Sequence, residues 1–398
     1  MCSLLVYKEK GNNYFLQKRG QDRTSYFEKN GLKFIHNLLS ITGKFTPQPF
    51  AEDEIVCLYN GEIYGRKFIK SDGENLIPLY KEYGIKFPRH LDGEFAIALY
   101  DFKNDLALFI TDPFASKPLW VKGIECASYE SGVGGKKIPA NTCLGKKIST
   151  EEELFEFEYH KWDWTQWKTG YDDCLKALKT AIEKRYQPRC FIGLSSGYDS
   201  GTIASVLLGR NLKCYSIIAS ENKSIINQRA NLLDVEVVED FDIKKEKEHL
   251  KDAEEFIYKT GESYKEDYAS WGLSHICRMA NKENRKIYLS GMGADEIISD
   301  YSLIPTQSQF KGKFPDRLYK WENFNDGKMF DYLGKEECVA GSWNIETRYP
   351  FLDKAFVQEY LWLAPELKNR RYKSVLAEYL DQNQFPYEPN KKIGFCLL

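Results

Sequence analysis

The sequence predicts an α/β protein of two domains, with an antiparallel β-rich half followed by a doubly wound, mainly parallel sheet. Three observations support this. A chain of 398 residues suits two domains of ordinary size. Its first part, to about residue 140, contains short β-like runs separated by turns. After about residue 170, segments typical of strands alternate with segments typical of helices, which favours a parallel sheet between helices.

In the first part, residues 55–59 form an apolar run that ends before Asn60-Gly61, a dipeptide typical of turns. Residues 95–100 and 106–111 form two further runs, and residues 101–105 between them read as a hairpin loop. A polar stretch rich in Trp at 149–169 marks the boundary, so we expect domains at 1–150 and 165–398.

In the second part, the amphipathic spacing of Leu175, Leu178 and Ile182 predicts a helix. The segments that we expect are helices at 172–186, 201–209 and 269–280, and strands at 190–194, 214–218, 235–238 and 286–289. Ligands of such sheets bind at the carboxyl ends of the strands. Motifs that follow these strands are therefore candidates for the binding site.

Composition excludes several functions. With 56 basic and 58 acidic residues, the net charge of -2 gives no electrostatic reason to expect nucleic-acid binding. No apolar run approaches the ~20 residues that a membrane-spanning helix needs, and the N-terminal run is too short for a signal peptide. Ten Cys residues without a CxxC pair indicate reduced thiols, so we expect a cytoplasmic protein.

Small residues follow the strand at 190–194 and lead into a predicted helix. Exposed N–H groups and a helix N-terminus at such a turn favour phosphate, and Asp199 can hold Mg²⁺. The other reading is an ordinary strand-to-helix turn capped by Ser and Asp. The turn therefore predicts a phosphate site, and the resemblance of this segment described next implies that Leu194, Ser195, Gly197, Asp199 and Ser200 bind ATP.

Residues 195–200, SSGYDS, resemble the PP-loop SGGxDS of ATP pyrophosphatases, with Ser196 in place of Gly. The segment 290–296, SGMGADE, is similar to the SGEGxDE loop of asparagine synthetases. This resemblance implies that Ser290 and Gly291 contact the nucleotide and that Asp295 joins Asp199 on the metal. Lys373, in a KxxL segment, is implied to stabilise charge on the phosphates.

Cys2 follows the initiator Met, and a free α-amine on Cys2 can take the thiol proton. Further along, RGQD (19–22), NGEIY (60–64), SDGE (71–74) and LDGEFA (91–96) occur in order. Together these segments resemble class II glutamine amidotransferases with an N-terminal nucleophile, which fold as an αββα sandwich. The resemblance implies that Asn60 and Gly61 form the oxyanion hole and that Glu62 and Asp72 bind glutamine.

Both resemblances together cover nearly the whole chain in the order found in glutamine-hydrolysing asparagine synthetases. They imply a carbon–nitrogen ligase that uses glutamine, ATP and Mg²⁺ to convert a small carboxylate, aspartate or another acid, into an amide through an acyl-adenylate. Relatives often form homodimers. Two alternatives stay open: a carboxylate–amine ligase of the lactam synthetase type, and a pseudoenzyme that binds nucleotide without turnover.

Several positions depart from the family pattern. Leu38 stands where the family has an Arg for the glutamine carboxylate, and Arg19 or Lys44 is the expected replacement. Ala115 stands where the family has Gly. Met292 replaces the Glu of SGEG, so either Glu296 or a Tyr serves as base, or the acceptor differs from aspartate.

Overall fold

The computed structural model describes residues 2–218, 221–239, 241–249, 268–301, 303 and 308–391. These residues divide into two compact units. The N-terminal unit comprises the chain to Lys161 together with Leu333–Glu346, and the C-terminal unit comprises the remaining described residues. The segment Leu333–Glu346 thus belongs to the N-terminal unit although it follows most of the C-terminal unit in sequence.

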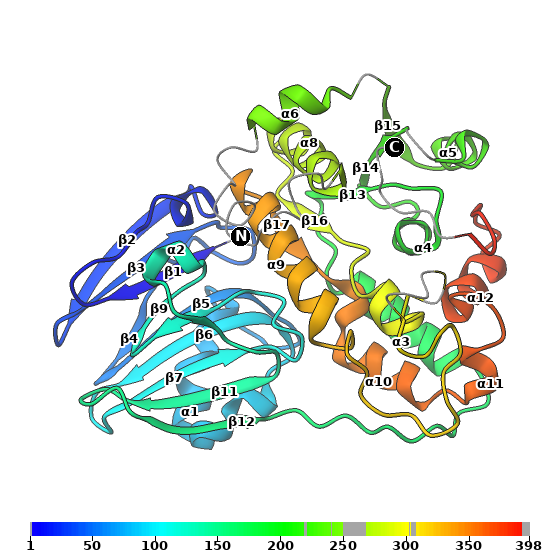
Figure 1. The fold of residues 1–398 in the computed structure, drawn as a ribbon. Coiled ribbons are helices and arrows are strands. Elements are labelled where there is room, and N and C mark those ends of the chain that lie inside the picture. The colour runs from blue at the N-terminus through cyan, green and yellow to red at the C-terminus, as the bar shows by residue number, and fades with distance from the viewer. Residues whose placement is uncertain are drawn as a thin grey trace. The chain divides into compact units, whose positions relative to one another are not determined.

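Two six-stranded antiparallel sheets form the N-terminal unit (Figure 1). In sheet order, the first contains β10 (Lys136–Lys137), β8 (Trp120–Lys122), β9 (Glu125–Ala127), β1 (Ser3–Tyr7), β3 (Leu32–Leu38) and β2 (Arg23–Lys29). The second contains β12 (Glu153–Glu158), β11 (Thr142–Lys147), β7 (Leu106–Thr111), β6 (Gly93–Asp101), β5 (Ile55–Ile63) and β4 (Phe50–Glu52).

Alternating side chains on the strands build the layers of this unit. On β1, Leu4 and Val6 enter the core between the sheets, where they join residues of β5, β6 and β7. Leu5 points the other way and packs with Tyr129, beside the short helix α2 (Glu130–Val133). Because every second residue changes face, one strand contributes to two apolar layers.

Helical segments cover both outer faces of the two sheets. Helix α1 (Leu76–Tyr83) packs on the second sheet through Leu76, Ile77 and Leu79 (Figure 1). The first sheet is covered by α2, by the turn η1 (Leu16–Lys18) and by Cys338 of α9 (Gly327–Ser342). The predicted αββα sandwich is confirmed. Strand β12 lies within the stretch 149–169, because Phe155 and Phe157 alternate with Glu and pack on the second sheet.

A five-stranded sheet organises the C-terminal unit, in the order β15 (Asp234–Val238), β14 (Lys213–Ile217), β13 (Cys190–Gly193), β16 (Ile287–Leu289) and β17 (Glu346–Arg348). Strand β13 pairs in parallel with β14 and β16, and β14 pairs in parallel with β15. The predicted doubly wound parallel sheet is therefore confirmed, and each predicted strand matches an observed one to within a residue or two.

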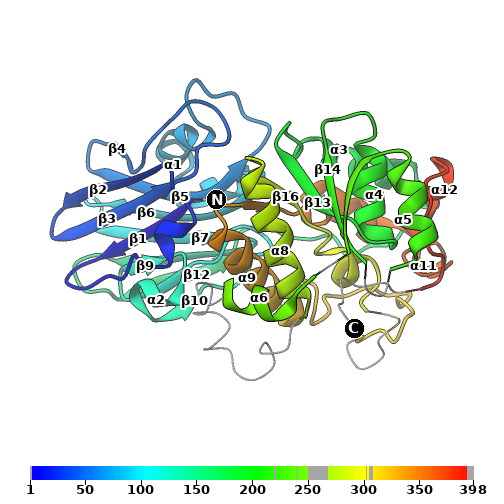
Figure 2. The ribbon, with the colours of Figure 1, turned by 90° about the horizontal axis from the view of Figure 1, so that it is seen from above.

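Helices lie on both faces of this sheet. Figure 2 shows α8 (Tyr268–Lys282) on one side and α4 (Tyr198–Val206) and α5 (Lys223–Ala230) on the other. The further helices that the structure describes here are α3 (Asp172–Glu183), α6 (Ile243–His249), α10 (Lys354–Trp362), α11 (Pro365–Lys368) and α12 (Ser374–Gln382). In the described part of the chain, no helix is both long enough and apolar enough to cross a membrane.

Asp353 fixes one corner of the C-terminal unit. Its Oδ1 caps α10 by accepting from the amides of Ala355 at 3.0 Å and Phe356 at 3.4 Å. Its Oδ2 lies 2.8 Å from Nη1 of the buried Arg185 and also pairs with Lys184. Burial raises the pKa of Asp353, but the positive charges of Arg185 and Lys184 lower this pKa to about 2. The carboxylate therefore joins the start of α10 to the end of α3.

Replacing Asp353 with Asn retains an oxygen for the cap but removes the charge. Arg185 is 1% exposed, so we expect the free energy of unfolding to fall by about 3–5 kcal/mol, as for a broken buried ion pair. The pKa of Asp353 is depressed in the folded state, so its contribution is complete above the unfolded pKa and disappears as pH falls toward about 2. Denaturant titrations at pH 7 and pH 3 measure both effects. The exposed Asp316→Asn is the control, and equal stability of the two variants contradicts the prediction.

Candidate active sites

Cys2 precedes β1, and its thiol lies against the backbone of Leu39. The Leu39 amide donates to Sγ at 3.4 Å, and the thiol lies 3.7 Å from the Leu39 carbonyl oxygen. Burial raises the pKa of Cys2 to about 11; the Leu39 bond lowers this pKa, while the carboxylates of Glu346 and Glu62 raise it. At neutral pH the thiol is protonated and needs a base before it can act as a nucleophile.

A buried cluster of charges holds the backbone at Cys2. Arg19 donates from Nε to the Cys2 carbonyl oxygen at 3.1 Å and from Nη2 to Glu337 Oε2 at 2.8 Å. The other oxygen of Glu337 accepts from Lys117 Nζ at 2.8 Å, and Glu94 lies 3.8 Å from the same ammonium. Arg19 and Glu337 are both fully buried. Arg19 therefore holds the backbone of Cys2 in place through its carbonyl oxygen. The predicted contact of Arg19 with glutamine stays a prediction.

Strand β5 presents Asn60, Gly61 and Glu62 in succession. Asn60 is fully buried, and its side-chain amide nitrogen and oxygen have no hydrogen-bond partner among the described residues. An unmatched buried amide is costly, and a ligand or a buried water can supply the missing partner. Gly61 has φ +136°, and a Cβ there would lie 1.8 Å from the Glu94 carbonyl oxygen, so only Gly fits. These features suit the predicted oxyanion hole.

The two predicted glutamine-binding carboxylates have internal partners. Glu62 accepts from the Thr42 hydroxyl at 2.8 Å. Asp72 accepts from the Tyr59 hydroxyl and from the Ile63 amide, the latter at 2.7 Å. Burial raises the pKa of Asp72, whereas these hydrogen bonds lower it. Asp72 thus ties its turn to β5, and its role toward glutamine stays a prediction.

The positions in the N-terminal unit that depart from the family pattern differ in burial and in backbone conformation. Leu38 is buried at the end of β3. Of the two cations expected to replace the missing Arg, Arg19 is buried, whereas Lys44 is exposed. Ala115 adopts φ +49°, a left-handed conformation that Gly adopts without strain. The methyl group at Ala115 therefore costs stability relative to Gly.

The phosphate loop of the C-terminal unit leaves β13 at Leu194 and enters α4 at Tyr198. Within it, the Ser195 amide donates to Ser200 Oγ at 3.0 Å, and the Gly197 amide donates to Ser195 Oγ at 3.2 Å. The two hydroxyl oxygens lie 2.9 Å apart. The predicted ATP-binding residues of this loop thus form one compact turn at the N-terminus of a helix, where anions bind readily.

Ser196, the departure from the PP-loop pattern, has a partner that Gly could not have. Its hydroxyl donates to Glu221 Oε2 at 2.5 Å, and its amide donates to the same oxygen at 2.5 Å. From the opposite side, the buried Arg229 donates to the carbonyl oxygens of Ser195 and Gly197, the latter at 2.9 Å. Glu221 and Arg229 therefore brace the loop.

Three predicted residues from distant segments meet beside this loop. Lys373 Nζ lies 2.6 and 2.7 Å from the two carboxylate oxygens of Asp199 and 2.9 Å from Asp295 Oδ1. Tyr372 donates to the same Asp295 oxygen at 3.2 Å. Burial lowers the pKa of Lys373, but the two carboxylates hold that pKa well above its ordinary value. Lys373 also has φ +47° and ψ +47°, a strained conformation of the kind found at functional sites.

The second motif forms a π-helical turn, η6 (Ala294–Ile298), after β16. Ser290 is buried there, and its hydroxyl accepts from the Met292 amide at 3.0 Å. Gly291 lies close to Asp199, since a Cβ on it would be 3.1 Å from the Asp199 Cβ. Glu296 is buried and bonded to Tyr301 and the Gly293 amide, and burial together with Asp295 raises its pKa to about 7.

The predicted metal ligands are Asp199 and Asp295. Among the described residues, no group of three or more His, Cys, Asp or Glu could hold a metal. Asp199 and Asp295 converge on one ammonium, so they lie close enough to share a cation. Mg²⁺ commonly binds one or two carboxylates and takes phosphate oxygens and water as its other ligands. The pair therefore fits Mg²⁺ that arrives with a nucleotide.

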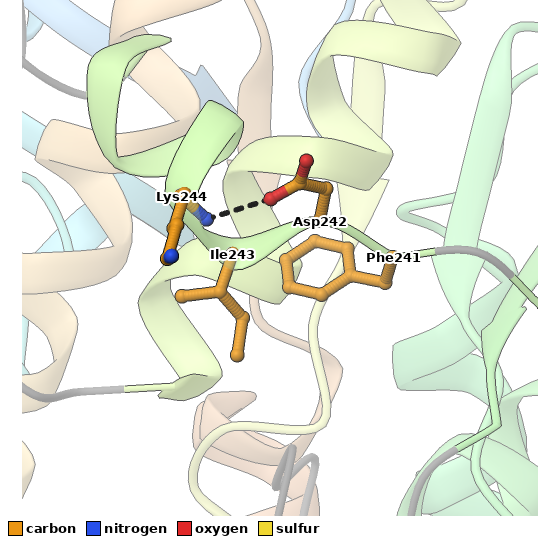
Figure 3. A pocket seen from close by; sticks show the side chains of 4 residues that line it. All are labelled: Phe241, Asp242, Ile243 and Lys244. Atoms are coloured by element: carbon orange, nitrogen blue, oxygen red, sulfur yellow. Dashed lines mark hydrogen bonds between the residues drawn. The ribbon is translucent and has the colours of Figure 1, made fainter.

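A hollow of about 380 Å³ elsewhere in the C-terminal unit lacks comparable chemistry. It is lined by Phe241, Asp242, Ile243 and Lys244 at the start of α6 (Figure 3). Asp242 Oδ1 accepts from the Lys244 amide at 3.0 Å, so its carboxylate serves as the helix cap. The hollow offers no convergent reactive groups.

Sequence reasoning did not single out three residues that contact the candidate sites: Glu337 near Cys2, and Glu221 and Arg229 at the phosphate loop. Glu337 comes from the segment that returns to the N-terminal unit, about 335 residues after Cys2 in the chain. No local pattern marks it. For Ser196, the unusual hydroxyl was a signal that a partner existed, but the sequence could not identify Glu221.

Replacing Glu337 with Gln leaves Arg19 and Lys117 buried without their shared carboxylate. We expect the free energy of unfolding to fall by about 3–5 kcal/mol. We also expect Cys2 to react faster with iodoacetamide at pH 8, because a looser segment is better hydrated and its thiol pKa falls. Peptide mapping by mass spectrometry measures the alkylation of Cys2 separately from other thiols. The exposed Glu152→Gln is the control, and an unchanged Cys2 rate in Glu337→Gln contradicts the role of the cluster.

Comparison with known proteins identifies a family for each half of the chain. The family described as "Glutamine amidotransferase domain" matches residues 9–162, and "Asparagine synthase" matches residues 174–337. A putative glutamine-hydrolysing asparagine synthetase of Methanocaldococcus jannaschii is 26% identical over 400 residues, covering 86% of this chain and 72% of that protein. A probable asparagine synthetase of Schizosaccharomyces pombe is also 26% identical, covering 92% of this chain and 75% of the relative.

Among solved structures, the glutamine phosphoribosylpyrophosphate amidotransferase from B. subtilis matches with a TM-score of 0.32 and 12% identity, covering 78% of this chain and 79% of that chain. The two family matches and the sequence relatives span most of the chain in the same order. The chain therefore consists of a glutamine amidotransferase domain followed by an asparagine synthase domain, and it is a distant homologue of the asparagine synthetases.

Proposed function

We propose that this protein is a glutamine-dependent ligase that consumes ATP and converts a substrate carboxylate into an amide. The asparagine synthase domain implies ATP use, and the glutamine amidotransferase domain implies glutamine as a substrate. The specific residues, the role of Mg²⁺ and the acceptor are part of the proposal.

In the N-terminal unit, Cys2 is the proposed nucleophile, with its own α-amine as base once Met1 is removed. The thiolate attacks the carboxamide carbon of glutamine, and the buried Asn60 amide and the Gly61 N–H stabilise the resulting oxyanion. Ammonia leaves with the proton that the thiol gave up, and water then hydrolyses the thioester to glutamate. Arg19 holds the Cys2 backbone during these steps.

In the C-terminal unit, ATP is proposed to bind on residues 195–200 and on Ser290 and Gly291, with Asp199 and Asp295 on its Mg²⁺. An oxygen of the acceptor carboxylate attacks the α-phosphorus, and the bond from that phosphorus to the β-phosphate oxygen breaks. Pyrophosphate leaves with the electron pair, and Lys373 stabilises the charge. Ammonia then attacks the acyl carbon and loses a proton, and AMP leaves.

The convergence of Lys373 with Asp199 and Asp295 is the single observation that carries this proposal. Three segments far apart in sequence bring one cation and two carboxylates together at the end of β13 and β16, beside a turn suited to phosphate. A lone surface lysine would lie in solvent.

Replacing Cys2 with Ala tests the division of labour between the two units. We expect glutamine-dependent amide formation to fall by at least about a hundredfold, because the nucleophile is lost. Reaction with added ammonium chloride should persist, because the second site keeps all its groups. Production of AMP is measured with each nitrogen source, and Cys126→Ala, which removes another buried thiol of the same unit, is the control. Loss of both activities in Cys2→Ala alone argues against the proposal.

Replacing Lys373 with Met is the reciprocal test. Two carboxylates then face each other without a cation, and charge on the phosphates loses its stabilisation, so we expect pyrophosphate–ATP exchange to fall at least about a hundredfold. Release of glutamate from glutamine should change less than about twofold, because this reaction needs only the first site. The exposed Lys311→Met serves as control. Retention of exchange in Lys373→Met rules out the assigned role.

A further inference from the structure

A cavity of about 220 Å³ lies beside Lys373 in the C-terminal unit. Lys373 and Tyr372 form part of its wall, and these two residues also bind Asp295. Ligand sites for drug-sized molecules are ~300–1,000 Å³, so this cavity suits a smaller one. A molecule in it lies next to the groups proposed to hold the phosphates of ATP.

The charges on the cavity wall are of one sign. The charged residues among its described lining are Lys368, Arg371 and Lys373, and none is Asp or Glu. Arg371 pairs with Asp381 at 2.6 Å, and Lys373 pairs with Asp199 and Asp295. These carboxylates already have cationic partners and do not line the cavity. Among the described lining residues, a ligand therefore finds cationic side chains and no carboxylate that could receive an ammonium group.

Lys368 adds to the positive charge of the cavity wall. Its buried ammonium donates to the carbonyl oxygens of Leu361 and Leu363, at 2.8 and 2.5 Å, and to Gln166 Oε1 at 2.8 Å. All three acceptors are uncharged, so the positive charge of Lys368 is not cancelled by a hydrogen-bonded carboxylate. Burial lowers the pKa of Lys368 to about 7, so this side chain is only partly charged at neutral pH and the positive charge of the wall increases below pH 7.

The rest of the wall includes apolar side chains. Ile298 is 2% exposed and Phe314 is 5% exposed, and both line the cavity. Leu303 lines it as well and is 45% exposed, so a substitution there has room. Hydrocarbon atoms of a ligand can pack against these side chains, whereas an ammonium group would lose its water there without gaining a carboxylate partner.

We propose that this cavity binds the acceptor of the ligase reaction, and that the acceptor is a small carboxylic acid whose body carries no ammonium group. The inference rests on the proposed function and deepens it by naming the substrate class. The carboxylate to be activated lies at the Lys373 end, and its uncharged carbon chain lies along Ile298 and Phe314. An α-amino acid such as aspartate places its ammonium among cations.

Pyrophosphate–ATP exchange by the full chain tests this with two matched pairs of acids. Succinate and aspartate differ only in an ammonium group, and so do butanoate and 3-aminobutanoate. We expect the acid without the ammonium group to support exchange at least about tenfold better in one or both pairs, as for one unmatched charged contact. Equal or better exchange with the amino acids overturns the inference, and so does absence of exchange with all four.

A charge added to the cavity should change this preference. Leu303→Glu supplies a carboxylate for an ammonium group, and Leu303→Gln is its uncharged control of similar size. We expect the ratio of exchange with aspartate to exchange with succinate to rise about tenfold in Leu303→Glu and to stay at the original value in Leu303→Gln. The same shift in both variants, or none in Leu303→Glu, contradicts the assignment of the cavity.

The two proposals can fail separately. If aspartate is the better acceptor while glutamine is hydrolysed through Cys2, the ligase proposal stands and the substrate class is wrong. If none of the acids supports exchange and glutamine is not hydrolysed, the proposed function itself fails. Glutamate release, measured on the same preparation, distinguishes these outcomes.

Discussion

Charged groups that lose water need partners within the protein, and ion pairs that meet this constraint join distant segments at both candidate sites. Arg19 and Lys117 both form ion pairs with Glu337, and Arg19 also binds the Cys2 carbonyl oxygen. Lys373 joins Asp199 and Asp295 beside the phosphate loop. Each buried cation brings together parts of the chain that have no local reason to meet, so the ion pairs define the geometry of the sites.

The same constraint distinguishes buried polar groups that have partners from those that do not. Asp72 and Glu62 have partners within the protein, whereas the buried Asn60 amide has none among the described residues. At the phosphate loop, the Ser196 amide donates to Glu221, and Arg229 donates to loop carbonyl oxygens. Contacts within the protein therefore hold the conformation of this loop.

Departures from the family pattern are local and leave the backbone intact. Ala115 adopts a left-handed conformation suited to Gly, and Ser196 gains the bond to Glu221 that Gly would lack. Met292 keeps its amide bonded to Ser290, so the second loop retains its turn although its carboxylate is missing.

The sequence by itself determined the two fold classes, the order of strands and helices in the C-terminal unit, and the motifs that contain Cys2, Asn60, Asp199, Asp295 and Lys373. Periodicity and turn chemistry are local, so they can be read from neighbouring residues. Only the tertiary structure decided that Arg19 pairs with Glu337, that Ser196 binds Glu221, and which side chains surround the cavity. These contacts depend on burial and on matching charges across hundreds of residues, and no local pattern encodes them.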